Sequence, residues 1–424
     1  MLQTIAHAWK IPDIRKKIIF TLMMLLIFRV GANIPVPGID RNVLREVFDG
    51  GTGLFQLFDL FSGGAFSNFT VFALSITPYV TASIILQLLT ISVPALENLS
   101  REGTEGKKKI AQYVRYLTVA LAFVQAIGLS VGMFRQALIS TDFFSVAVIV
   151  ITLSAGTAFL MWLGEQINEN GIGNGISLII FAGIIGGAPT AIHSTWIQYQ
   201  ADQVRIVSIL LFCVFALVVI CGIVEVQQGQ RRIPVQYAKR VVGRKMYGGQ
   251  NTHIPIKVNQ AGVIPVIFSL SLLQFPLTVT YFFQDSGFTQ FVAKYLSPAG
   301  TPGIWIYGAL NILFIMFFTY FYTTITFNTL EVADNMKNNG GFIPGIRPGR
   351  ATVEYLSKVM SRITFVGAVF LAFIATLPTL IQQFTALQIG FGGTSLLIVV
   401  GVALDTMKQL ESQMVMRNYQ GFLK

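Results

Sequence analysis

Ten long apolar runs constrain the fold of this chain more than any other feature of its sequence. A helix rises about 1.5 Å per residue, so about 20 apolar residues cross the hydrocarbon core of a bilayer, which is about 30 Å thick. Only 12% of the 424 residues are charged, whereas a soluble protein has about a quarter. The sequence therefore predicts an all-α integral membrane protein with ten transmembrane helices. The expected spans are 18–36, 68–92, 112–134, 143–163, 174–192, 206–225, 259–283, 304–328, 363–382 and 391–408.

A transmembrane barrel and a cleaved signal peptide are both disfavoured. The apolar runs are continuous and do not alternate at every second residue, as the strands of a barrel do. The first run follows Lys16 and Lys17, as in a signal peptide. Arg29 interrupts that run and no small-residue cleavage site follows it, which favours a retained first helix.

Lysine and arginine are distributed unequally between the two sides of the predicted membrane. Of the 30 basic residues, 24 fall at the N-terminus, in the 2/3, 6/7 and 8/9 loops and in the C-terminal tail. Five fall on the opposite side, and Arg29 lies inside an apolar run. The positive-inside rule then places both termini and the long loops 226–258 and 329–362 in the cytoplasm.

Ten spans divide into two groups of five at the outer loop 194–205. This gives an N-terminal half, 1–193, and a C-terminal half, 206–424. Because each half has an odd number of spans, the second runs opposite to the first, and inverted repeats are geometrically available. Faint echoes support this arrangement: "SITPYV" and "GVIPVI" carry a proline in spans 2 and 7, and "GNGISLII" and "GGTSLLIV" open spans 5 and 10.

The sequence lacks the motifs of common catalytic and nucleotide sites. It has no H-E-x-x-H, Walker A or G-x-S-x-G motif and no cluster of cysteine and histidine. Ion-coupled transporters usually keep ionisable groups at mid-membrane, and only Arg29 lies well inside a span here. We expect neither enzymatic activity nor a cofactor.

A short apolar segment, Leu54 to Phe61, precedes Ser62, Gly63 and Gly64. Eight helical residues extend about 12 Å, which is too short to cross a bilayer. Leu54, Leu57, Phe58 and Phe61 have the i, i+3, i+4, i+7 spacing of one helix face. On these residues alone, an amphipathic helix lying in the lipid headgroups remains a good interpretation.

Several stretches closely resemble the SecY family, the central subunits of bacterial protein-conducting channels. They are "FSGGAFSNFTVFALSITPYVTASIILQLL", "GEQINENGIGNGISLIIFAGI", "QGQRRIPVQYAKR", "THIPIKVNQAGVIPVIF", "ADNMKNNGGFIPGIRPG" and "FGGTSLLIVV". The resemblance covers nearly the whole chain in the family's order. Val80, Thr81 and Thr329 depart mildly from the usual residues. The resemblance implies two inverted five-helix halves that close like a clamshell around a central pore.

The resemblance also implies a pore waist made of aliphatic side chains from spans 2, 5, 7 and 10. Matched to the motifs, the ring consists of Ile76, Val80, Ile176, Ile180, Ile267 and Ile398. Two pairs have the i, i+4 spacing that lets both members face the axis from one helix. An aliphatic constriction sheds water and blocks ions when it is closed.

The family further implies a plug and a lateral gate. The plug is the short helix of residues 54–64, folded against the ring from outside with Ser62, Gly63 and Gly64 as its hinge. Its residues are Leu54, Phe55, Leu57, Phe58, Leu60, Phe61, Ser62, Gly63 and Gly64. Thr81, Gln87 and Asn174 are polar residues at gate positions, where weak interhelical hydrogen bonds suit a reversible seam. Helix-packing contacts without gating account for these three residues as well.

The basic loops offer docking sites for partners. Arg231, Arg232, Arg244, Lys245 and Arg347 lie in the two long loops, which the family uses to bind the SecA motor ATPase and the ribosome. Phosphates of ribosomal RNA attract such residues, although a topology signal or contact with anionic lipid headgroups accounts for basic loops too. Small SecE-like and SecG-like membrane subunits, signal peptides and nascent chains are the other partners that the resemblance implies.

We therefore expect a passive channel in a bacterial plasma membrane. It would pass unfolded secretory polypeptides, release transmembrane segments sideways into lipid, and take its energy from SecA or the ribosome. The main alternative from the residues alone is an inverted-repeat transporter of a small solute, which the broken helices fit and the shortage of intramembrane charges does not.

Overall fold

The computed structural model describes most of the chain. The described residues are 7–40, 43–44, 62–201, 206–237, 240–242, 245–247, 251–280, 282–283, 286–296, 302–384 and 393–421. Residues 54–61 of the predicted plug and Arg244 lie outside this set, and the side chain of Lys245 is likewise not described.

Ten helices coincide one for one with the ten predicted spans. They are α2 (Pro12–Gly31), α5 (Thr77–Ser92), α7 (Thr104–Ile127), α8 (Phe143–Asn170), α9 (Gly175–Gln200), α10 (Ile206–Gln228), α11 (Ile264–Thr280), α13 (Gly303–Thr326), α15 (Arg350–Phe384) and α16 (Gly393–Gly421). Among the described residues, six helical segments are long and apolar enough to cross a membrane by length and composition. The number is seven if the bent pair of α5 and the short α6 (Pro94–Arg101) forms one span. Of the others, α11 is apolar but shorter. Charged residues lie in the first half of α2 and the second half of α16.

Helix boundaries follow local chemistry. Proline occupies the first turn of α2, α5 and α6, where its missing N–H costs nothing. Between α5 and α6 the chain bends by 98°, and α6 begins at Pro94. The side chain of Asn174 caps α9 by accepting a hydrogen bond from the backbone N–H of Ser177.

Residues 62–76, before α5, cross part of the span as buried turns and not as helix. Backbone hydrogen bonds fasten this segment to the end of α2: Val36 N–H donates to the Phe69 carbonyl, and Val71 N–H to that of Ile34, both at 3.0 Å. Phe69 and Ser75 have φ of +44° and +52°, which non-glycine residues seldom adopt. Irregular backbone at membrane depth is stable only where protein surrounds it, as here.

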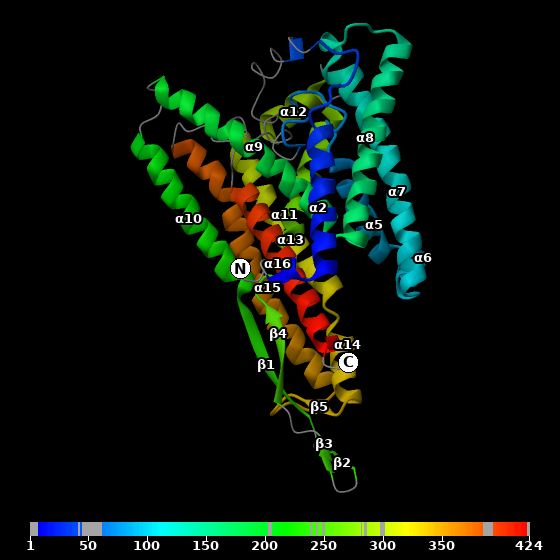
Figure 1. Ribbon diagram of the computed structural model, residues 1–424, viewed down its shortest axis with the longest axis vertical. Coiled ribbons are helices and arrows are strands. Elements are labelled where there is room, and N and C mark those ends of the chain that lie inside the picture. The colour runs from blue at the N-terminus through cyan, green and yellow to red at the C-terminus, as the bar shows by residue number, and fades with distance from the viewer. Residues whose placement is uncertain are drawn as a thin grey trace.

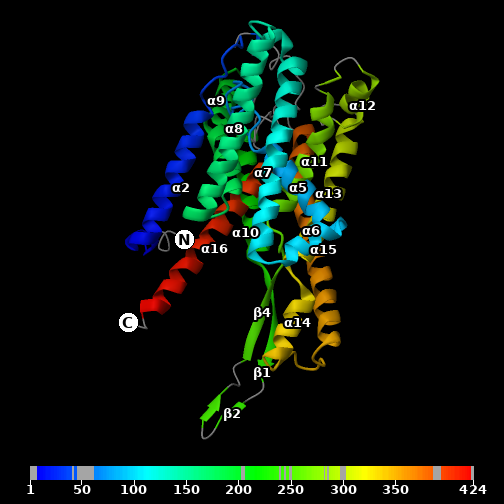
Figure 2. The ribbon, with the colours of Figure 1, turned by 90° about the vertical axis from the view of Figure 1, so that its right-hand side faces the viewer.

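The helices stand side by side in one bundle (Figures 1 and 2). Within it, α5 packs against α7 and α11, α9 against α8 and α16, and α13 against α11 and α15. Glycines allow some of the tightest contacts. A Cβ on Gly156 of α8 would overlap the carbonyl oxygen of Val71, and one on Gly175 would overlap that of Gly164.

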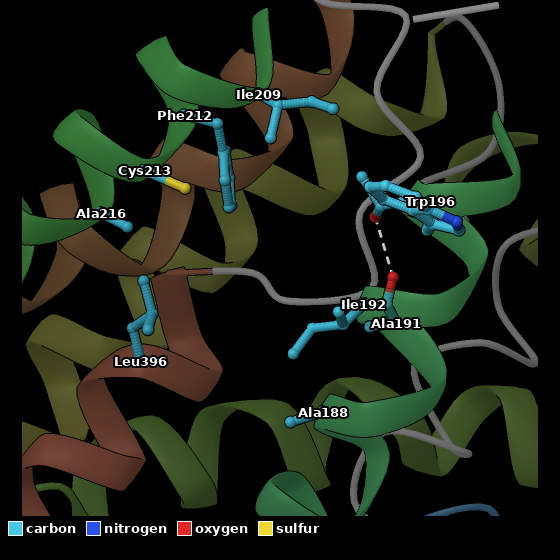
Figure 3. Close-up of a pocket in the computed structure, with 10 residues that line it drawn as sticks. Ala188, Ala191, Ile192, Trp196, Ile209, Phe212, Cys213, Ala216 and Leu396 are labelled. Atoms are coloured by element: carbon cyan, nitrogen blue, oxygen red, sulfur yellow. Dashed lines mark hydrogen bonds between the residues drawn. The ribbon is translucent and has the colours of Figure 1, made fainter. Parts of the chain in front are cut away.

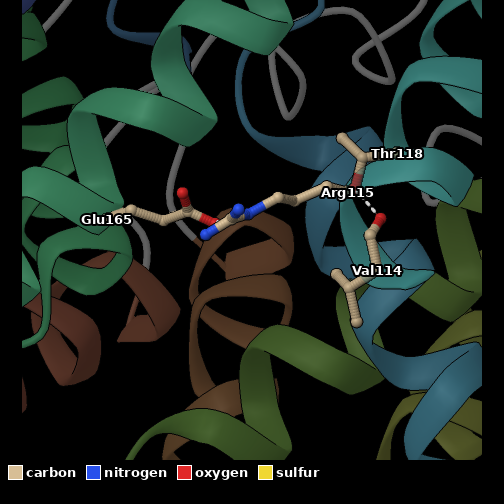
Figure 4. A network of polar contacts seen from close by, with 4 residues as sticks. All are labelled: Val114, Arg115, Thr118 and Glu165. Atoms are coloured by element: carbon tan, nitrogen blue, oxygen red, sulfur yellow. Dashed lines mark hydrogen bonds and ion pairs between the residues drawn. The ribbon is translucent and has the colours of Figure 1, made fainter. Parts of the chain in front are cut away.

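An ion pair joins α7 to α8 (Figure 4). Arg115 Nε donates to Glu165 Oε1 at 2.8 Å, and both side chains are partly exposed. One turn further along α7, Thr118 Oγ1 donates to the Val114 carbonyl of its own helix at 2.7 Å. A partly exposed pair of this kind adds about 1 kcal/mol at most, so the close packing of α7 and α8 holds them together.

A small sheet lies beside α14 and one end of α15 at one end of the molecule (Figures 1 and 2). In it, β1 (Gln230–Tyr237) pairs antiparallel with β4 (Asn251–Lys257), Ile233 opposite Ile254, and also with β5 (Gly341–Phe342). At its far tip, β2 (Arg240–Val242) pairs with β3 (Lys245–Tyr247). The sequence predicted only loops in this region, so these strands are an addition to the all-α expectation.

The sheet joins the two long basic loops, because β1 and β4 come from the 6/7 loop and β5 from the 8/9 loop. Ile233, Val235 and Ile256 form an apolar cluster with Ile343 from the 8/9 loop and Leu356 from α15. The short helix α14 (Thr329–Asn338) completes this platform, which we define as the strands β1 to β5 together with α14 and residues 339–349. At the other end of the bundle lie α12 (Gly287–Tyr295) and the segments η1 (Gly128–Met133) and η2 (Arg135–Ala137).

We predict that Gly156→Ala destabilises the protein by about 1–3 kcal/mol, the usual range for overpacking. The added methyl group would overlap the backbone of Val71, which cannot move without disturbing the anchored segment 62–76. Gly308→Ala in α13 is the control, because nothing lies within 4 Å of its Cβ position. Thermal unfolding in detergent measures the difference, and equal melting temperatures for the two variants would contradict the assigned contact.

Candidate pore and gate

The predicted ring residues converge on one apolar cluster at the centre of the bundle. Ile76 and Val80 reach it from the start of α5, Ile180 from α9, Ile267 from α11 and Ile398 from α16. All five are at most 8% exposed. Four helices that are distant in sequence therefore each contribute buried aliphatic side chains to one apolar cluster.

The two predicted ring residues of α9 differ from each other. Ile180 is buried in the central cluster, whereas Ile176 is half-buried and packs partly against Gly164 of α8. Ile184 is fully buried in the cluster one turn beyond Ile180, and it was not among the predicted residues. Ile184 follows Ile180 by four residues, and this i, i+4 spacing could have predicted that both lie on the same face of the helix.

Side-chain hydrogen bonds do not join α5 to α11 in the described part of the chain. The two helices are in contact, yet no ion pair joins them either among the residues that the structure describes. In contrast, α11 is fastened to α13, because Ser269 Oγ donates to Asn311 Oδ1 at 2.8 Å and both residues are buried.

The three polar residues predicted for the gate bond within their own helices. Thr81 Oγ1 donates to the Thr77 carbonyl at 3.0 Å, and Gln87 Nε2 contacts Ser83 Oγ at 3.4 Å. Asn174 caps α9. The described structure thus has none of the interhelical hydrogen bonds that we expected from these residues, and their part in gating stays a prediction.

Ser62, Gly63 and Gly64 form a tight turn against α9. Ser62 Oγ accepts a hydrogen bond from the Phe66 N–H at 2.9 Å. Gly63 and Gly64 have φ of +65° and +89°, a region that glycine enters without steric cost. A Cβ on Gly63 would lie 2.7 Å from the carbonyl oxygen of Gly183, so the turn rests directly on the backbone of α9.

Comparison with known proteins identifies the family. The family model for SecY matches residues 70–407. The protein translocase subunit SecY of Halalkalibacterium halodurans is 50% identical over 436 residues, and the alignment covers 100% of both chains.

The chain belongs to the SecY family.

Solved structures share the fold. A protein-conducting channel superposes with a TM-score of 0.66 at 21% identity, covering 95% of this chain and 93% of its own. Sec61 in the canine ribosome–channel complex from the endoplasmic reticulum gives a TM-score of 0.63 at 19% identity, with coverage of 95% and 93%. The predicted membrane fold is therefore confirmed.

Three of the basic residues predicted for partner binding lie on the platform of this SecY chain. Arg231 and Arg232 are exposed on β1, and Arg347 is exposed after β5. Because the sheet links the two loops, it brings residues more than a hundred positions apart onto one small domain.

Two pockets lie between helices of this SecY chain. An apolar pocket of about 450 Å³ separates α9 from α10, with Ile192, Trp196 and Phe212 among its lining residues (Figure 3). A second pocket of about 530 Å³ lies where the end of α5 meets α6, α7 and α13, next to Gln87 and Tyr322.

We predict that Ile180→Ser raises the resting ion conductance of the channel by about tenfold or more, because an apolar constriction excludes ions only while it sheds water. Ile192→Ser is the matched control, since Ile192 lies on the same helix with 71% of its surface exposed. Single-channel recording in planar bilayers measures the effect. A verified, folded Ile180→Ser variant as silent as the control would argue against Ile180 in the waist.

Proposed function

We propose that this chain is the pore subunit of a bacterial protein translocase. Unfolded secretory polypeptides would cross the membrane through the waist formed by Ile76, Val80, Ile180, Ile267 and Ile398. Transmembrane segments would leave sideways between α5 and α11. The observation that carries the proposal is the burial, in one apolar cluster, of aliphatic side chains contributed by α5, α9, α11 and α16 in a member of the SecY family.

The chemistry of the waist suits a substrate of any sequence. Aliphatic side chains offer no hydrogen bonds, so a passing polypeptide finds no fixed site at which to bind. Lateral release needs a seam that opens reversibly. Separation of α5 from α11 breaks apolar contacts but no side-chain hydrogen bond of the described chain.

Residues 54–64 would serve as the plug. The family resemblance supports this role, and Ser62, Gly63 and Gly64 have the glycine-rich turn expected of a hinge. Residues 1–193 and 206–424 would form the two inverted halves. We expected 194–205 to be the loop between them, but α9 continues to Gln200, so residues 194–200 belong to that helix.

The protein is a multi-pass membrane protein, and we place both termini and the platform in the cytoplasm. The charge distribution supports this orientation. The cytoplasmic ends of α2 and α16 also point toward the end that carries β1 and β4 (Figure 2). Its bacterial relative supports a plasma membrane location.

Partners would supply the energy, because the sequence has no nucleotide-binding motif. The platform would dock the SecA ATPase or the ribosome, and the ribosome-bound Sec61 neighbour supports the second. SecE-like and SecG-like subunits, signal peptides, nascent chains and anionic lipids are the remaining partners that we propose from the family.

Crosslinking tests the path of the substrate. With a photoreactive residue at position 76, 180 or 398, we expect a stalled secretory chain to crosslink to each. We expect none from position 207 on α10, where Val207 is 68% exposed on the outside of the bundle. Equal crosslinking from all four positions would contradict a central path. Saturable uptake of a small solute by the intact protein would favour the transporter alternative.

Charge reversal tests the platform. Arg231→Glu with Arg232→Glu should weaken ribosome binding and lower the slope of log affinity against log salt by about two, because each basic residue lost removes one phosphate contact. Arg135→Glu is the control, since Arg135 lies at the opposite end of the bundle. Co-sedimentation with ribosomes over a salt series measures both. An unchanged slope would place the ribosome contact elsewhere.

A further inference from the structure

Arg29 is the one basic residue well inside an apolar run, and the structure shows what it contacts. Its Nη1 donates to the Gly63 carbonyl at 2.8 Å, and its Nη2 donates to the Gly186 carbonyl at 2.9 Å. The guanidinium of α2 thus bridges the turn Ser62–Gly64 and the middle of α9.

The backbone of α9 is shaped to receive this guanidinium. A Cβ on Gly186 would lie 2.5 Å from Arg29 Nη1 and 2.9 Å from Cζ, so any larger residue would displace the charged group. The next residue, Gly187, has nothing within 4 Å of its Cβ position. Pro189 lies inside the same helix, and its missing N–H interrupts the hydrogen-bond ladder beside the site.

The turn is equally constrained. Gly63 has a positive φ, and a Cβ added to it would lie only 2.8 Å from the Cα of Gly183. Its carbonyl can therefore reach Arg29 only while its backbone lies flat on α9. The guanidinium of Arg29 therefore depends on two closely packed glycines, Gly63 and Gly186, whose carbonyls accept its two hydrogen bonds.

No carboxylate pairs with Arg29 in the part of the chain that the structure describes. An unpaired charge inside a membrane protein is costly and usually serves a function. Here two backbone carbonyls accept from it, and the planar guanidinium presents two donors in a fixed fork that an ammonium group lacks.

We propose that Arg29 is a positioning residue that latches the turn Ser62–Gly64 onto α9 and so keeps the resting waist closed. From the turn, the buried segment 65–76 leads directly to Ile76 and Val80. Release of the Gly63 carbonyl frees the start of that segment and loosens two side chains of the waist. The latch rests on the proposed channel function.

Two pairs of variants test the latch. Arg29→Met removes both hydrogen bonds at similar side-chain length, and Arg29→Lys keeps the charge but cannot make the bidentate contact. Gly186→Ala keeps Arg29 and pushes its guanidinium away, whereas Gly187→Ala, one residue along, meets nothing. Each is purified in its complex with its membrane subunits, checked for thermal stability, and recorded in planar bilayers.

Arg29→Met and Gly186→Ala should raise the resting conductance by roughly tenfold, since each hydrogen bond to a charged group shifts a two-state equilibrium by at least that factor. Arg29→Lys should fall between Arg29→Met and the wild type, and Gly187→Ala should match the wild type. Thermal stability should change little, because the helix packing is retained. A conductance increase at nearly constant melting temperature distinguishes the latch from a general packing role.

If the resting conductance of Gly186→Ala equals that of Gly187→Ala, the latch is overturned, even if Arg29→Met fails to fold. A leak that appeared only with a parallel loss of thermal stability would also overturn it. Polypeptide translocation by the wild type separates the latch from the channel function on which it rests. If the wild type translocates and the latch variants stay quiet, the latch is wrong and the channel stands; if the wild type does not translocate, the proposed function fails.

Discussion

The hydrocarbon of a bilayer supplies no hydrogen bonds, and the rest of this structure depends on that constraint. Every backbone group at membrane depth must find its partner inside the protein. Helices meet this requirement alone, which explains the ten helical spans. The turn segment 62–76 meets it through hydrogen bonds between its own residues, through bonds to residues 34–36 beyond α2, and through the bond from Arg29 to the Gly63 carbonyl. Its irregular path is therefore tied to its neighbours in a way that a helix is not.

Within the bundle, apolar and polar contacts have different roles. Apolar contacts between helices are non-directional and re-form wherever the surfaces meet, so they suit the waist and the α5–α11 seam. Polar contacts fix geometry. The Ser269–Asn311 bond holds α11 to α13, and Tyr320 Oη donates to the Ser361 carbonyl at 3.2 Å, which holds α13 to α15.

The sequence was most informative where one constraint dominates. Span length and the absence of charge predicted the ten helices. Five of the six aliphatic residues taken from the motifs are buried in the central cluster, which has many further members that the motifs did not indicate. The strands were missed because the basic residues of "QRRIPVQY" suggested a solvated loop, although Ile233 and Val235 alternate as in a half-buried strand. Arg29 was noticed but received no role, since its partner Gly186 is 157 residues away and only the fold brings them together.

The distribution of polar contacts decides which helices can part. On one side of the seam, α11, α13 and α15 are linked in series by buried or side-chain hydrogen bonds and should move as one unit. On the other side, α5 has no side-chain hydrogen bond to α11 in the described chain, but the segment that leads into it is held to α2 and α9 at the turn Ser62–Gly64. An opening motion of least cost therefore leaves the α11–α13–α15 group intact and separates it from α5. The start of α5, near Ile76, would then stay in place during opening. The seam would widen most at the other end of α5, next to α6, where the 530 Å³ pocket lies between α5 and α13.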